Sequence, residues 1–65
     1  MKYQPGQAVI LLDTEFKPAV HAVIKEVNNE TQKYLIEFCY PGSIKPEEIW
    51  VSQDRLSLTP DLVRN

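Results

Sequence analysis

Short apolar runs recur along the chain, and turn-forming residues separate them. Residues 7–12 contain an unbroken apolar run after a Pro-Gly pair, which predicts a buried strand. Residues 13–18 are mostly polar and end in proline, which predicts a loop. Residues 19–27 are rich in valine and lead into a turn at residues 28–31, where asparagine tolerates the left-handed backbone of a hairpin. Residues 19–27 also fit the apolar stripe of a helix, but this segment is short and poor in helix formers, so we favour a strand.

The clearest strand pattern lies in the middle of the chain. Over residues 33–39 the side chains of Tyr34, Ile36 and Phe38 alternate with the rest, so these three are expected to share one face. Because they share that face, Tyr34 and Phe38 are predicted to be core residues rather than site residues. The loop that follows, residues 40–46, begins with Tyr-Pro-Gly-Ser.

The last third of the chain predicts two more strands. Residues 48–52 alternate so that Trp50 lies on the face opposite its apolar neighbours. A tight 3-10 turn at residues 53–54 and a short closing strand at residues 55–58 follow. Residues 59–61 (Thr-Pro-Asp) are suited to cap one final helical turn.

Five short strands without a long helix predict an all-β fold. Because exposed sheet edges invite aggregation, a small protein gains by curling such a sheet into a barrel. The chain is short enough for one domain only, residues 1–65, with a core at 3–58 and a tail at 59–65.

The order of these segments resembles SH3-like barrels of the Tudor and chromo-barrel type. The resemblance spans about residues 3–58. It implies a five-stranded SH3-like barrel with a short 3-10 turn near the C-terminus. Chromo-barrels usually carry extra aromatic residues in the loop after the third strand, whereas this chain has Tyr40 alone there. The phrases that carry the resemblance are Tyr3-Gln4-Pro5-Gly6-Gln7-Ala8-Val9-Ile10, Ala22-Val23-Ile24-Lys25-Glu26-Val27, Tyr34-Leu35-Ile36-Glu37-Phe38 and Glu48-Ile49-Trp50-Val51-Ser52-Gln53-Asp54-Arg55-Leu56.

A fainter resemblance is to the plasmid-borne type II dihydrofolate reductases, which are also small SH3-like barrels. Their active tetramer builds one central pore around a Val-Gln-Ile-Tyr phrase. Here Glu48-Ile49-Trp50 lies nearby in the pattern, with Glu48 in place of the amide and Trp50 in place of the tyrosine. The reductase activity is therefore not carried over to this chain.

Size and charge narrow the classes of function. A 65-residue chain has little volume for a deep pocket, so a ligand is expected on the surface or between subunits. The net charge of -2 argues against generic nucleic-acid binding, which needs a basic excess. Cys39 is the only cysteine, which excludes an internal disulfide and fits a reducing, cytoplasmic setting. The first residues do not resemble a signal peptide, and no apolar run is long enough to span a membrane.

The sequence contains no arrangement that points to catalysis or to a cofactor. His21 and Cys39 are single residues without the partners that a metal site or a nucleophilic triad needs, so both are predicted to be structural. Glu47 and Glu48 are adjacent in a strand and point to opposite faces, which suits them poorly to acid-base work on one substrate.

The candidate ligand-binding residues are Phe16, Tyr40, Trp50 and Glu48. Phe16 and Tyr40 lie in loops that flank one barrel end in the family, and with Trp50 they could line a shallow aromatic groove. Glu48 would belong to an acidic rim that favours a cationic peptide. The alternatives are structural: the Trp50 ring covers an open barrel end, Phe16 folds over the core as a lid, and Glu48 is an ordinary solvated charge.

The sequence therefore predicts a small non-catalytic module that binds a protein or peptide through loop aromatics or a strand edge. Three alternatives stay open. The chain could be a structural subunit that assembles with itself or joins a larger complex, since a small core gains from assembly. It could be an enzyme whose site forms between subunits, or a nucleic-acid-binding barrel.

Overall fold

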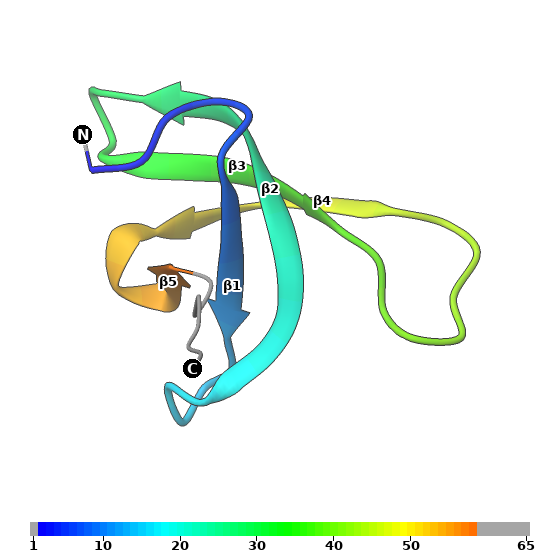
Figure 1. Ribbon diagram of the computed structural model, residues 1–65. Coiled ribbons are helices and arrows are strands. Elements are labelled where there is room, and N and C mark those ends of the chain that lie inside the picture. The colour runs from blue at the N-terminus through cyan, green and yellow to red at the C-terminus, as the bar shows by residue number, and fades with distance from the viewer. Residues whose placement is uncertain (1, 59–65) are drawn as a thin grey trace, which may run out of the picture.

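Five antiparallel strands form one sheet in the computed structural model of the chain, which describes residues 2–58 (Figure 1). The strand order is β4-β3-β2-β1-β5. The predicted all-β class and the predicted 3-10 turn are confirmed. Within the described residues no helix is long or apolar enough to cross a membrane. The elements are β1 (Ala8–Leu12), β2 (Pro18–Asn28), β3 (Lys33–Phe38), β4 (Glu47–Ser52), the 3-10 turn η1 (Gln53–Arg55) and β5 (Leu56–Leu58).

The sheet is open in the part of the chain that the structure describes. β4 and β5 are its two edges and do not pair with each other. Each of the five predicted strands begins and ends within one residue of an observed strand. The helical turn predicted at residues 59–61 and the tail at 59–65 lie outside the described residues.

In the β2–β3 turn the left-handed backbone belongs to a different residue from the one predicted. It is Gln32, with φ of 62°, and not an asparagine. Asn28 instead uses its side chain: Oδ1 accepts hydrogen bonds from the backbone N–H groups of Glu30 (2.9 Å) and Thr31 (3.1 Å). This side-chain-to-backbone pattern is a common way for asparagine to stabilise a turn.

β2 is the strand that curves the sheet around the core (Figure 1). Its first half pairs with β1 and its second half with β3. The register shifts between Ile24 and Glu26, which leaves Lys25 without an opposing residue in β3. A second shift lies near the start of β2, where Leu11 opposes Val20 and Leu12 opposes Pro18. Because an extra residue bends a strand and increases its twist, the two irregularities let one sheet enclose apolar side chains.

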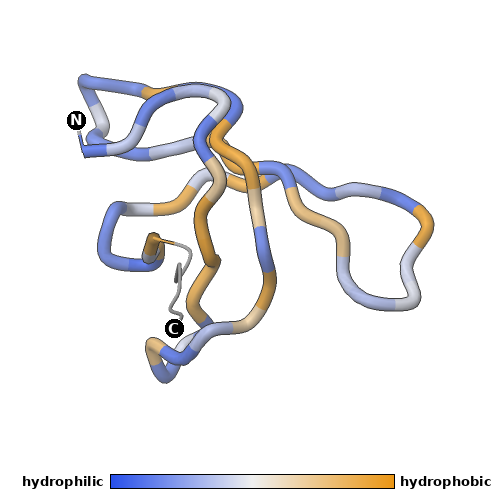
Figure 2. The backbone as a smooth tube through the Cα atoms, viewed as in Figure 1, coloured by the Kyte–Doolittle hydropathy of each residue, from blue (hydrophilic) through white to orange (hydrophobic). Residues whose placement is uncertain are grey.

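The core lies on the concave face of this curved sheet. Tyr34, Ile36 and Phe38 are buried, as the alternation of residues 33–39 predicts. Figure 2 shows apolar stretches along β1 and β2 and mostly hydrophilic connecting segments. The buried cluster consists of Tyr3, Val9, Leu11, Ala22, Ile24, Tyr34, Ile36, Phe38, Val51 and Leu56.

Tyr3, which precedes the first strand, joins three parts of the chain inside this core. Its ring meets the ring of Tyr34 edge to face, with centroids 5.4 Å apart. The backbone N–H of Tyr3 donates to the Tyr34 hydroxyl at 3.0 Å, and the Tyr3 hydroxyl donates to the Leu56 carbonyl at 3.4 Å. The Pro5-Gly6 turn places Tyr3 there: Gly6 has φ of 89°, which suits glycine in a type II turn.

We expect Tyr34→Phe to lower the free energy of unfolding by about 1–3 kcal/mol, because it leaves the buried N–H of Tyr3 without an acceptor. Urea denaturation at equilibrium measures the change. Tyr40→Phe is the matched control, since Tyr40 is 48% exposed. Equal stability of the two variants would show that the Tyr3–Tyr34 hydrogen bond contributes nothing.

Candidate functional site

Trp50 lies on the outer, convex face of the sheet, away from the core. It stands directly opposite Leu35 of β3, and residues that oppose each other in an antiparallel pair share a face. The next pair along, Ile36 and Ile49, belongs to the inner face. Trp50 is 46% exposed, so its ring is not part of the core.

Glu48 shares the outer face with Trp50 and stands opposite another carboxylate. Its partner across the β3–β4 pair is Glu37. Lys25, the residue at the β2 irregularity, contacts Glu37 with Nζ 3.4 Å from Oε1. One lysine therefore compensates one of two facing carboxylates, and like charges directly opposite each other destabilise a strand pair.

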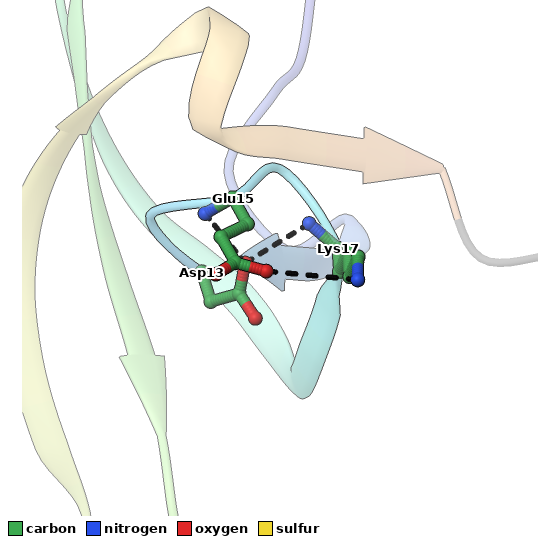
Figure 3. Close-up of polar contacts among 3 residues, drawn as sticks. All are labelled: Asp13, Glu15 and Lys17. Carbon is green, nitrogen blue, oxygen red and sulfur yellow. Dashed lines mark hydrogen bonds and ion pairs between the residues drawn. The ribbon is translucent and has the colours of Figure 1, made fainter.

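The β1–β2 loop that carries Phe16 is organised by Asp13 (Figure 3). Asp13 Oδ1 accepts hydrogen bonds from the backbone N–H groups of Glu15 (2.8 Å) and Lys17 (3.0 Å). The Asp13 carbonyl accepts a further bond from the N–H of Phe16 at 2.9 Å. An exposed ion pair joins Lys17 Nζ to Glu15 Oε1 at 3.6 Å. The N–H of Asp13 also donates to the Lys17 carbonyl at 2.9 Å, so five polar contacts within residues 13–17 fix the backbone at Phe16.

Phe16 itself has an unusual backbone for a bulky residue. Its φ is 62°, in the left-handed region that costs a non-glycine residue about 1–2 kcal/mol. The side chain is 58% exposed and does not close over the core. Burial of the ring therefore does not explain why a phenylalanine occupies this position.

Tyr40 belongs to the β3–β4 loop, which projects from the body of the sheet (Figure 1). The N–H of Ser43 donates to the Tyr40 carbonyl at 2.9 Å, across the Pro41-Gly42 pair. Gly42 has φ of 87°, as the third position of a type II turn requires. The Tyr40 ring meets Phe38 edge to face, with centroids 5.1 Å apart, so it lies beside a core residue of the inner face.

The structure brings two of the four candidate residues together. Glu48 and Trp50 are two positions apart in β4 and share its outer face. The β1–β2 loop with Phe16 and the β3–β4 loop both leave the same end of the antiparallel sheet, but the curvature of the sheet directs them away from each other (Figure 1). Within residues 2–58 no ring contact joins Phe16, Tyr40 and Trp50 to one another. The aromatic groove predicted from all three is therefore not formed as a single cluster.

A shallow hollow of about 400 Å³ lies beside the same outer face, and sequence reasoning missed it. It forms where the irregular β2 strand meets the start of the β3–β4 loop, and no local motif marks such a place. The Cys39 thiol, one of its walls, donates to the Ser43 carbonyl at 3.1 Å. No hydrogen bond among the described residues joins this thiol to His21. Its walls include Ala8, His21, Val23, Glu37, Cys39 and Pro46.

The described residues contain no group of three or more His, Cys, Asp or Glu side chains that could hold a metal ion.

Comparison of the chain with protein-family models, with curated proteins and with solved structures found no match. On the edge strand β4, the exposed indole of Trp50 lies two positions from Glu48, a carboxylate that forms no ion pair with another described residue.

We expect Phe16→Asn to raise the free energy of unfolding by about 1 kcal/mol, because asparagine tolerates the left-handed backbone. Thermal and urea denaturation measure the gain. Thr14→Asn in the same loop is the control, since Thr14 does not have a positive φ and should gain nothing. A loss of stability in Phe16→Asn would instead show that the ring makes stabilising contacts.

We expect Glu48→Gln to stabilise the fold by a few tenths of a kcal/mol, about 0.3–0.5, because it removes the repulsion from Glu37. The gain should shrink as the salt concentration approaches about 1 M, where charges are screened beyond roughly 3 Å. Urea denaturation at low and high salt tests both statements. Glu47→Gln is the control because Glu47 opposes Phe38, and an equal gain there would contradict the pairwise explanation.

Proposed function

We propose that the chain is a small protein-interaction module that binds an extended segment of a partner along the outer edge of β4, which no strand within residues 2–58 covers. In this mode the partner adds a strand to the sheet, main-chain hydrogen bonds supply affinity, and side chains supply specificity. The observation that carries the proposal is an edge strand whose central tryptophan is 46% exposed.

β4 lacks several of the features with which proteins usually protect an edge. Edge strands are commonly kept short, bulged, or marked with charged residues or proline. β4 has six residues, pairs with β3 without a shift in register, and contains neither lysine nor proline; its charged residues, Glu47 and Glu48, lie at one end and leave the centre of the strand apolar. β5 at the other edge has three residues, and its shortness is itself protective. These contrasts support β4 as the edge that a partner would join.

Both faces of this edge carry apolar surface. Trp50 is exposed on the outer face, and Ile49 is 38% exposed on the inner face. Because successive side chains of an added strand point to alternate faces, one would lie beside Trp50 and the next beside Ile49. Glu48, next to Trp50 on the outer face, favours a lysine or arginine of the partner at that end of the strand.

We also propose that the open sheet is an SH3-like barrel of the Tudor type. The strand order with β5 beside β1, the irregular β2 and the turn η1 before β5 support this assignment.

A cytoplasmic location is proposed as well. The exposed thiol of Cys39 supports it, since thiols persist in reducing compartments.

The experiment selects peptides from a random display library on the wild-type chain and measures their affinity by fluorescence anisotropy. We expect Trp50→Lys to weaken the selected peptides at least about tenfold, because a central tryptophan commonly dominates such contacts. Ile44→Lys also replaces an apolar residue by lysine, at a fully exposed loop position, and should leave the affinity unchanged.

Amide hydrogen exchange locates the bound peptide. Protection should increase along β4 and not along β5. Peptides that bind Trp50→Lys as well as wild type, or a library that yields no binder, would overturn the proposed function.

A further inference from the structure

The outer edge of β4, which is not paired with any other described strand, matches the same edge of a second β4. We propose that the strand added there is β4 of a second copy of this chain, paired antiparallel about a two-fold axis at Trp50. The inference rests on the proposed function, because it names the partner of the same edge. A two-fold pair buries one surface against itself, so the surface must be self-complementary.

The alternation of the strand restricts the registers that two β4 strands can adopt. Directly opposed residues in an antiparallel pair share a face. Trp50 belongs to the outer face and Ile49 to the inner face, so the two cannot oppose each other. The two-fold axis therefore passes at Ile49 or at Trp50, since these are the positions near the strand centre that pair with themselves.

Charge distinguishes these two registers. With the axis at Ile49, Glu48 opposes Trp50 of the other copy, and the two Glu48 carboxylates become diagonal neighbours about 7–8 Å apart. With the axis at Trp50, Glu48 opposes Ser52, and the two Glu48 positions lie about 13 Å apart along the strands. That separation exceeds the screening length of roughly 8 Å at physiological salt. The Trp50 register therefore avoids the repulsion.

Apolar contacts favour the same register. With the axis at Trp50, the two exposed indoles meet at the centre of the interface, and Ile49 opposes Val51. With the axis at Ile49, the carboxylate of Glu47 opposes Val51, a residue of the core. A tryptophan at the centre of an interface is the residue type and place where binding energy concentrates.

The interface is small, and a weak dimer is the expected result. Two six-residue strands bury less than the roughly 1,600 Å² of a standard interface. We expect a dissociation constant on the order of 10 µM. Sedimentation equilibrium from about 1 µM to about 1 mM should show a shift from the 7.5 kDa monomer to twice that mass.

Charge-exchange variants test the register. Trp50→Lys and Trp50→Glu should each weaken self-association at least about tenfold, because each places like charges face to face at the axis. An equimolar mixture of the two should restore the dimer. Ile44→Lys, a fully exposed loop residue away from β4, is the matched control and should dimerise as wild type does.

Cysteine cross-linking tests the same register without a charged substitution. In a Cys39→Ser background, Trp50→Cys should give a disulfide-linked dimer on mild oxidation. Ser52→Cys should not, because two Ser52 positions would lie about 13 Å apart. Circular dichroism checks that each variant folds.

The outcomes separate this inference from the proposed function. A wild-type chain that stays at 7.5 kDa up to about 1 mM, yet binds selected peptides along β4, overturns the dimer and leaves the proposed function standing. A dimer that Trp50→Lys does not weaken, or that cross-links through Ser52→Cys instead of Trp50→Cys, also overturns the inference. Failure of both peptide binding and dimerisation overturns both proposals.

Discussion

The buried contact between Tyr3 and Tyr34 is the constraint on which the rest of the structure depends. The two edges of the sheet do not pair within the described residues, so hydrogen bonds between edge strands do not hold the curled sheet around its core. Tyr3 instead reaches from the N-terminal segment to β3 and to the carbonyl of Leu56 at the start of β5. Arg55 adds a second link, since its Nη2 donates to the carbonyl of Leu12 at 2.7 Å. The two edge strands are joined along the chain by η1, and these side chains fix that turn and β5 against β1 and β3.

Because the concave face takes most of the apolar side chains, the polar and charged side chains lie on the convex face and along the β4 edge. The irregularity at Lys25 couples the two faces, since it changes the face that each later residue of β2 occupies. As a result Glu26 opposes Leu35 on the convex face while Ile24 remains opposite Ile36 in the core. On that convex face the carboxylate of Glu37 has Lys25 as an ion-pair partner, whereas no ion pair among the described residues involves Glu48.

A bounded apolar run and a high valine content were enough to predict the first two strands. Alternation predicted the strands at residues 33–39 and 48–52, because burial on one face leaves a period of two in the sequence. It was enough for the face of Trp50 as well. Tyr3 was missed as a core residue, since a single tyrosine among polar residues has no period. The opposition of Glu37 and Glu48 depends on register, which a single sequence does not specify. The separation of Phe16 from Trp50 depends on how the whole sheet curves. The sequence therefore identified these aromatic residues as candidates, but it could not predict whether they lie close together.

The length of β4 poses a physical problem that self-pairing answers. Shortening this strand would remove Val51, which opposes Tyr34 in the core, so the chain cannot protect the edge in the way that it does at β5. A lysine or proline at position 49 or 50 would protect the edge only by giving up apolar surface or a backbone donor. An open edge with a tryptophan at its centre is instead stabilised when a strand covers it. A second copy of the chain carries the same strand and is present wherever the protein is, so a two-fold pair covers the edge without any other partner.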